Sequence, residues 1–247
     1  MLNMDYSKNC LSYWFPRLLD AGIPVPRTEI VQMSGEAARD VYGVFDGRPM
    51  TSITSASHAF FDELLAACKR IGYPVFLRTG QGSGKHKWRD TCYLAGPNEL
   101  RRHVVNLIEW SEIVDMIGLA WNVWCAREML LTTPVGVCPR YGDMPVCREF
   151  RFFVSDGTVR CQHPYWPSEA LTKGGFVHTA EWYSEFCALP KLDGIYDLAS
   201  RAGQAIGGEW SVDILDTKRG WVVTDCAIAQ QSWHWPGCPN AERKEVA

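Results

Sequence analysis

The chain has 247 residues, of which 47% are hydrophobic and 21% charged, with a formal net charge of −3. This composition allows one large domain or two small ones and excludes a disordered segment. Because no basic run is present, the sequence does not favour nucleic-acid binding. Without a signal peptide or an apolar stretch of membrane length, we expect a cytoplasmic protein that does not contact a membrane.

The first half of the chain predicts helices alternating with short strands. Helices are expected over residues 7–21, 58–71 and about 98–117, and strands over 74–78, 91–95 and 122–131. Gly22 and Gly72 end the first two helices, and Ser57 is expected to cap the second. The prolines of residues 23–31 favour an extended lead-in to a strand, whereas residues 34–56 give no clear prediction.

The second half predicts two β-hairpins around one helix. Strands are expected over residues 148–154, 159–163, 209–215 and 221–227, and a helix over about 191–206. The turns at 155–158 and 216–220 contain the glycine that a hairpin favours. Residues 166–185 look like a loop. The order of these elements indicates an α+β fold.

The ten cysteines are scattered and contain no Cys-x-x-Cys pair. Most lie in apolar runs, so we expect free thiols in a reducing compartment. His234 and Cys238 have the spacing of half a zinc site, but no second ligand pair is evident, and zinc is therefore not predicted. Several tryptophans fall in loop-like segments, where they can line a pocket as well as fill a core: Trp166, Trp182, Trp233 and Trp235.

A glycine-rich segment follows the strand at 74–78. Gly80, Gly82 and Gly84 let backbone N–H groups approach a phosphate closely, and Lys85 and Lys87 add positive charge. The segment is neither a Walker nor a Rossmann loop, because it leads to a strand instead of a helix. The alternative is a flexible hairpin tip with solubilising lysines.

Two acidic residues occupy similar places in the arms of the last hairpin. Asp213 and Asp225 provide hard oxygen donors on neighbouring strands, which suits Mg²⁺. The alternative is a pair of solvated strand aspartates.

Taken in order, these segments resemble the ATP-grasp superfamily over roughly residues 20–235. Residues 72–78 are similar to the family's strand whose basic residue, here Arg78 in place of the usual lysine, reaches the nucleotide phosphates. The glycine loop at 80–87 resembles the family's phosphate loop. Residues 127–130 resemble the strand that holds adenine, which implies contact of Glu128 with ribose or adenine.

The later segments extend the resemblance. The hairpin at 148–157 resembles the one whose arginine, here Arg151, contacts the transferring phosphate, and Asp213 and Asp225 fall where the family places its Mg²⁺ carboxylates. The chain looks most similar to small proteins related to the cell-division-cycle 123 group. Many of these are encoded by viruses or phages, which would place this protein in a host cytoplasm.

The resemblance implies an α+β, two-lobed ATP-grasp fold with a nucleotide held between two antiparallel sheets. Residues 1–56 would contribute to the substrate side, residues 57–120 would form the small lobe with the glycine-rich loop, and residues 121–247 would form the large lobe with the metal site.

The implied activity is ADP-forming ligation of a carboxylate to an amine through an acylphosphate, with ATP and Mg²⁺. The carboxylate and the amine acceptor would be small molecules or peptides. Arg78 and Arg151 would be catalytic; the implied ATP-binding set is Arg78, Lys85, Lys87, Glu128 and Arg151, and the implied metal ligands are Asp213 and Asp225.

Two other classes compete with the ligase. One is an ATP-binding assembly or interaction factor without turnover, which is favoured by Ala227 where the family commonly carries asparagine. The other, an AMP-forming nucleic-acid ligase, needs a nucleophilic lysine motif that we do not find. At single residues, Arg151 also has the simpler role of an ion pair, with Glu149 as its expected partner, and His163 is more readily a structural histidine than a general base.

Overall fold

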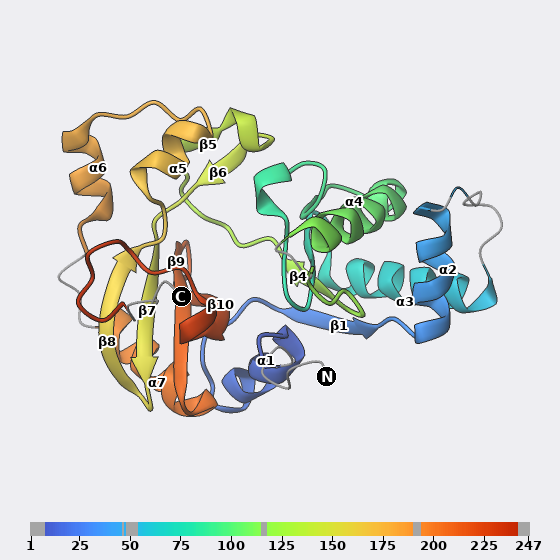
Figure 1. The fold of residues 1–247 in the computed structure, drawn as a ribbon, viewed down its shortest axis with the longest axis horizontal. Helices are drawn as coiled ribbons and strands as arrows, with labels where there is room; N and C mark the ends of the chain where they lie inside the picture. The colour runs from blue at the N-terminus through green and yellow to red at the C-terminus, as the bar shows by residue number, and fades with distance from the viewer. Residues whose placement is uncertain (1–7, 46, 48–53, 115–117, 190–193, 242–247) are drawn as a thin grey trace, which may run out of the picture. The chain divides into compact units, whose positions relative to one another are not determined.

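The computed structural model describes residues 8–45, 47, 54–114, 118–189 and 194–241 (Figure 1). The chain divides into two compact units. The first contains residues 1–26, 130–140 and 145–247, and the second contains residues 27–129 and 141–144. Each unit has a four-stranded sheet in which all neighbouring strands are antiparallel.

The sheet of the second unit has the order β1-β4-β2-β3. Its strands are β1 (Thr28–Gln32), β2 (Val75–Thr79), β3 (Tyr93–Leu94) and β4 (Val123–Glu128). The helices of this unit are α2 (Gly35–Phe45), α3 (Ser55–Ile71) and α4 (Leu100–Ile113). The strands predicted from residues 74–78, 91–95 and 122–131 are confirmed.

The core of the second unit lies between its helices and its sheet. Phe60, Leu64 and Ile71 recur at helical spacing, so α3 has one apolar face, and that face is buried. The Phe60 ring centroid lies 5.8 Å from that of Trp124, which ties α3 to β4.

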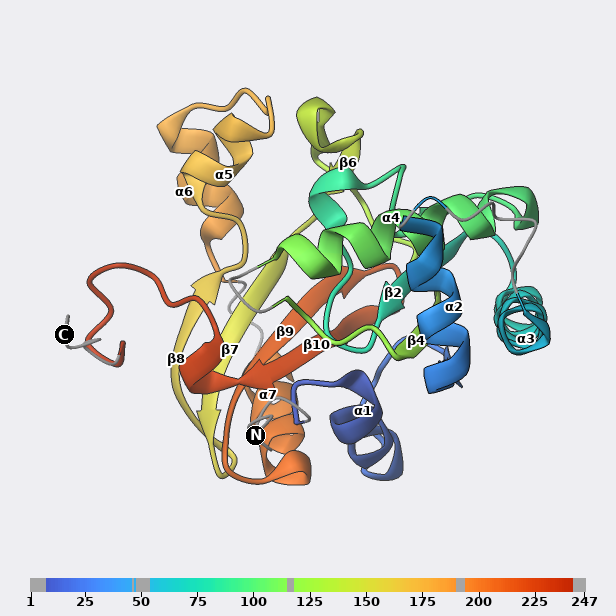
Figure 2. The same cartoon turned by 45° about the vertical axis from the view of Figure 1, so that its right-hand side comes forward.

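The sheet of the first unit has the order β10-β9-β7-β8 (Figure 2). Its strands are β7 (Glu149–Ser155), β8 (Thr158–Pro164), β9 (Glu209–Thr217) and β10 (Gly220–Ile228). Both predicted hairpins are thus confirmed. Asp156 and Gly157, between β7 and β8, have positive φ angles of 45° and 80°, as a two-residue turn that matches strand twist requires.

The two faces of this sheet carry different residues, because side chains alternate along a strand. Helices α1 (Leu11–Asp20) and α7 (Gly194–Ile206) belong to this unit, and α7 packs on β7 and β9. Phe152 makes an edge contact with Tyr196 of α7, at 5.4 Å between ring centroids. Arg151 and Phe153 alternate with Phe152 and therefore lie on the opposite face, where the candidate site is found.

Two expectations about local structure are wrong. Residues 166–185 contain α5 (Ser168–Lys173) and most of α6 (Ala180–Cys187) instead of a loop, and the hydroxyl of Thr179 accepts a hydrogen bond from Trp182 N at the start of α6. Ser57 does not cap α3; it is buried and donates to Asp40 Oδ2 at 2.6 Å. Parts of the helices expected over 98–117 and 191–206, residues 115–117 and 191–193, lie outside the described residues.

The remaining elements are short. Strands β5 (Gly136–Cys138) and β6 (Met144–Val146) form a two-stranded sheet, and 3₁₀ turns occur at Lys85–Lys87, Pro97–Glu99, Pro139–Tyr141 and Ala229–Gln231. All ten cysteines lie in the described ranges and are free thiols, as expected. None of the helices in the described part of the chain has both the length and the apolar character that crossing a bilayer requires.

The boundaries of the two compact units differ from the borders expected at residues 56 and 120. Strands β1 and β4 pair with each other, and β4 also pairs with β2, so residues from 28 to 128 share one sheet. The assignment of residues 1–56 to the substrate side stays a prediction.

Candidate functional site

The best-defined polar group of the first unit is an ion pair between neighbouring strands. Arg151 of β7 lies opposite Asp213 of β9 in the strand register. The guanidinium donates from Nε to Asp213 Oδ1 at 2.7 Å and from Nη2 to Oδ2 at 2.8 Å, a bidentate arrangement. The side chains are only 20% and 6% exposed, so both charges are largely removed from water.

The surroundings of Arg151 keep it charged. Burial lowers its pKa, but the charge and the hydrogen bonds of Asp213 outweigh burial and raise the pKa overall. Its guanidinium carbon lies 5.1 Å from the Tyr165 ring centroid, and Nη1 donates to the Trp233 carbonyl at 3.5 Å. The residue that forms this ion pair with Arg151 is Asp213 and not the expected Glu149, whose Oε1 accepts a hydrogen bond from Thr224 Oγ1 at 3.1 Å.

Asp225 lies directly across from Asp213 in the register of β9 and β10. A bulge between Val223 and Asp225 adds one residue to β10 at this point. Thr224 Oγ1 lies 3.3 Å from the Asp213 backbone carbonyl oxygen, which shares the hydroxyl proton with Glu149 Oε1, and Asp225 Oδ1 accepts from Cys226 N at 3.1 Å. The hairpin therefore brings the two predicted metal ligands to adjacent strands.

The donor set of this hairpin fits Mg²⁺. Each Asp213 oxygen accepts one hydrogen bond from Arg151 and retains a second lone pair, and Asp225 adds another carboxylate. Magnesium is usually held by one or two carboxylates together with substrate phosphates and water. The metal role of both aspartates stays a prediction.

The predicted phosphate-binding residues other than Arg151 lie in the second unit. Arg78 on β2 is only 3% exposed, and its Nε donates to the Thr79 carbonyl at 3.0 Å. Lys85 and Lys87 lie in a 3₁₀ turn, where Lys87 is exposed and Lys85 half-buried. As predicted, Arg78 lies near the end of a mostly buried strand that leads into the glycine loop.

The glycine loop is folded against its own unit. Gly82 N donates to Thr79 Oγ1 at 3.0 Å, and Gly80 N donates to the Val123 carbonyl at 2.8 Å. A Cβ on Gly82 would meet the Trp110 ring of α4, so the close approach requires glycine here. These two N–H groups are thus engaged within the chain in this conformation.

Glu128 ends β4 beside Arg27. Its Oε1 accepts from Arg27 N at 2.8 Å, and its Oε2 accepts from Arg27 Nε at 3.4 Å. Because the Glu128 side chain is 16% exposed while that of Arg27 is 64% exposed, the pair lies at the surface of its unit. The predicted contact of Glu128 with ribose or adenine stays a prediction.

His163 lies opposite Arg151, on β8. Burial lowers its pKa to about 4, with smaller contributions from His234 and Arg151, so the ring is neutral near pH 7. Its Nε2 is buried without a hydrogen-bond partner among the described residues. The sequence singled out His163 but did not predict that it lies beside Arg151 and His234.

The tryptophans of the segments that were expected to be loops differ in their burial. Trp166 is buried, and Trp233 is 49% exposed. Trp182 of α6 helps to line a cavity of about 290 Å³ in the first unit, together with Arg148, Glu185 and Asp216.

No protein-family model and no curated protein sequence matches this chain. The fold does match solved structures. D-alanine–D-alanine ligase from Bacillus anthracis, complexed with ATP, matches with a TM-score of 0.50 and 15% identity over 94% of this chain. The matched region is 60% of the ligase, so the chain spans less than two thirds of that enzyme. The antiparallel sheets and these matches define an ATP-grasp fold, which confirms the predicted fold class.

Within that class the fold is similar to that of Cdc123. The C-terminally truncated Cdc123 from Schizosaccharomyces pombe matches with a TM-score of 0.57 and 11% identity, over 92% of this chain and 86% of that chain. A second structure of Cdc123 from the same organism matches with a TM-score of 0.52 and 12% identity. At these identities the likeness concerns the fold alone.

Proposed function

We propose that this protein is an ATP-dependent, ADP-forming carboxylate–amine ligase. The observation that carries the proposal is the buried Arg151–Asp213 pair, which lies beside Asp225 on the sheet of an ATP-grasp fold. The ligase fold neighbour complexed with ATP supports nucleotide binding.

The proposed reaction has two steps. An oxygen of the substrate carboxylate attacks the γ-phosphorus of ATP, the bond to the β,γ-bridging oxygen breaks, and ADP leaves. An amine then attacks the acyl carbon of the acylphosphate, inorganic phosphate leaves, and the amine gives a proton to solvent. Such phosphoryl transfer depends mainly on positioning and charge neutralisation and requires no nucleophile from the protein.

The chain supplies cations for this chemistry. Arg151 would donate hydrogen bonds to the transferring phosphoryl group, where its planar fork suits two oxygens. Arg78, Lys85 and Lys87 would bind the nucleotide phosphates, and Glu128 the ribose or adenine. Asp213 and Asp225 would hold Mg²⁺, which neutralises phosphate charge when bound.

A second function, ATP binding without turnover, has its own support. Ala227 on β10 provides no side-chain oxygen where the family commonly has asparagine, and both oxygens of Asp213 are engaged by Arg151. The fold similarity to Cdc123 is compatible with an assembly or interaction factor of this kind.

Product analysis separates these functions. The protein is incubated with ATP, Mg²⁺ and mixtures of amino acids and short peptides, and ADP, AMP and phosphate are quantified by chromatography. We expect acceptor-dependent formation of ADP and phosphate, loss of this activity in Arg151→Met, and retention in Arg160→Met, which changes an exposed arginine of β8. ATP binding without ADP formation would favour the non-catalytic function, and AMP as product would contradict the ligase proposed here.

A further inference from the structure

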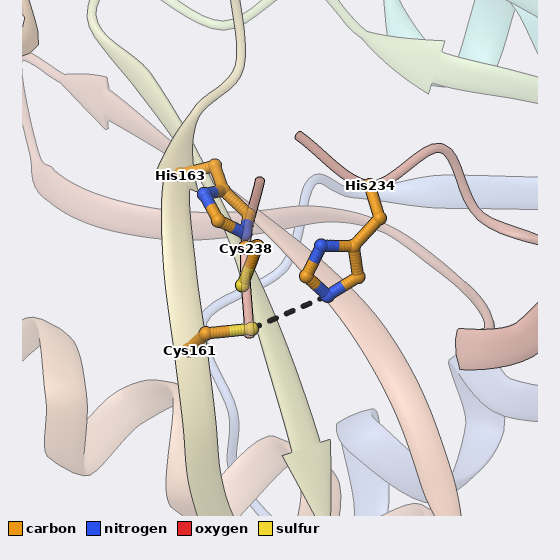
Figure 3. Close-up of side chains that lie close together, drawn as sticks. All are labelled: Cys161, His163, His234 and Cys238. Atoms are coloured by element: carbon orange, nitrogen blue, oxygen red, sulfur yellow. Dashed lines mark hydrogen bonds between the residues drawn. The ribbon is translucent and has the colours of Figure 1, made fainter. Parts of the chain in front are cut away.

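Four metal-binding side chains converge in the first unit, on the sheet face that also carries Arg151. Cys161, His163, His234 and Cys238 each direct one ligand atom into a cluster in which all these atoms lie within 4.8 Å of one another (Figure 3). This cluster supplies the second ligand pair that the spacing of His234 and Cys238 lacked in the sequence.

The two pairs come from distant segments. Cys161 and His163 are two residues apart on β8, so their side chains point to the same face of the strand. His234 and Cys238 lie in the segment that follows the 3₁₀ turn at Ala229–Gln231. That segment contacts β8 on either side of the cluster: Trp235 Nε1 donates to the Pro164 carbonyl at 3.0 Å, and Asn240 Nδ2 to the Arg160 carbonyl at 3.1 Å.

We propose that Cys161, His163, His234 and Cys238 form a structural zinc site that fastens the C-terminal segment to β8. This set of two thiols and two imidazoles is one of the common structural zinc sets, and it leaves no open position for a substrate. Zinc bond lengths of about 2.0–2.3 Å place tetrahedral ligands about 3.3–3.8 Å apart. The Cys161 Sγ–His234 Nε2 distance is already 3.3 Å, so only a small contraction of the cluster is needed.

The chemistry of the ligands is consistent with this site. His163 Nε2, which is buried and without a partner among the described residues, would gain one in the metal. Burial raises the pKa of the Cys161 thiol to about 12, with Cys238 adding to the shift, so zinc binding would release the proton of Cys161. Zn²⁺ with two thiolates and two neutral imidazoles has no net charge and therefore does not repel the nearby Arg151.

The site would also support the residues around Arg151. His163 is the register partner of Arg151, and the Trp233 carbonyl, which accepts from Arg151 Nη1, immediately precedes His234. Fixing the C-terminal segment thus fixes one side of the guanidinium. The zinc proposal does not depend on the proposed ligase activity.

Metal content tests the site directly. The 247-residue chain, with any affinity tag removed, is purified under reducing conditions without a chelator, and zinc is measured by mass spectrometry. We expect one zinc ion per chain in the wild type, loss of zinc in Cys161→Ser and in His163→Gln, and retention in Cys187→Ser, a half-buried cysteine outside the cluster. Cysteine variants that held as much zinc as the wild type would overturn the site.

A second measurement covers loss of metal during purification and poor folding of the variants. Cobalt(II) is added to the metal-free wild type, whose fold is checked by circular dichroism. We expect the absorption bands of tetrahedral cobalt with thiolate ligands, and their disappearance on addition of zinc. A folded wild type with neither zinc nor a cobalt spectrum, or one in which Cys161 and Cys238 form a disulfide under the same conditions, would overturn the proposal.

Discussion

The ion pair of Arg151 and Asp213 is the residue-scale feature on which the candidate site depends. Its two partners are 62 positions apart in the sequence and meet because β7 and β9 are neighbours. The sequence indicated that both residues are important, but it named Glu149 as the ion-pair partner. Local spacing does not determine which strand lies beside β7, and the pairing therefore could not be read from the sequence.

Removing Arg151 should destabilise the first unit. Arg151→Met leaves the carboxylate of Asp213, 6% exposed, without its counter-charge, and breaking such a pair costs about 3 kcal/mol of unfolding free energy. Urea denaturation measures the change. The control Asp197→Asn, at a 67% exposed site in the first turn of α7 where the carboxylate pairs with Arg201, should cost no more than about 1 kcal/mol. Equal stability of Arg151→Met and this control would show that the pair contributes little.

His103 should make the stability of the second unit depend on pH. Its side chain is fully buried; burial lowers its pKa, although Nδ1 lies 2.6 Å from the Thr91 carbonyl oxygen and that contact opposes the shift. Because the unfolded histidine has a pKa of about 6.5, the unfolded state binds more protons below that pH. The contribution of His103 is therefore complete above pH 6.5 and is lost as the pH falls from there through the lowered pKa.

Unfolding curves measured across this pH range test the effect. His103→Gln should show a flatter dependence of unfolding free energy on pH than the wild type, whereas His58→Gln, which changes an exposed histidine of α3, should keep the wild-type slope. An unchanged slope in His103→Gln would rule out His103 as the source.

At the scale of elements, the hairpins were predictable because their signals are local. The β7–β8 and β9–β10 pairs combine β-branched and aromatic residues with glycine at the turn. Helices α5 and α6 were missed because the Gly174-Gly175 pair interrupts the segment and several aromatic residues are scattered through it, so neither short helix shows a clear periodic pattern. The one clear signal there was Thr179, which caps α6. Ser57 was also expected to cap a helix, but its hydroxyl donates a hydrogen bond to Asp40, a contact that depends on tertiary packing.

Gly203 sets how closely α7 approaches β7. A Cβ at this position would lie 2.9 Å from Val154 Cβ, closer than such atoms approach. Gly203→Ala gains about 1 kcal/mol in helix propensity but overpacks the interface, at a cost of about 1–3 kcal/mol. We expect a net loss of unfolding free energy. Gly194→Ala, in the same helix with open space around it, should be neutral or raise stability by about 0.5 kcal/mol. A stabilising Gly203→Ala measured by urea denaturation would contradict this packing.

At the scale of the whole molecule, the order of motifs predicted the ATP-grasp fold better than any single motif did. The sheet that β1, β2 and β4 share was not predicted, because long stretches of intervening chain separate these strands. The proposed zinc ligands were not recognised in the sequence for the same reason, because Cys161 and His234 are in contact in the fold but lie 73 positions apart along the chain. Contacts of this range depend on topology, which a single sequence determines only weakly.

The most direct test of the central claim is calorimetric titration of the protein with ATP in the presence and absence of Mg²⁺. We predict binding that requires Mg²⁺ and that is lost in the variant carrying both Asp213→Asn and Asp225→Asn, while Asp197→Asn binds as the wild type does. Circular dichroism of each variant establishes that it is folded. Absence of ATP binding by folded wild-type protein would contradict the nucleotide-binding function on which the ligase proposal and its non-catalytic alternative both depend.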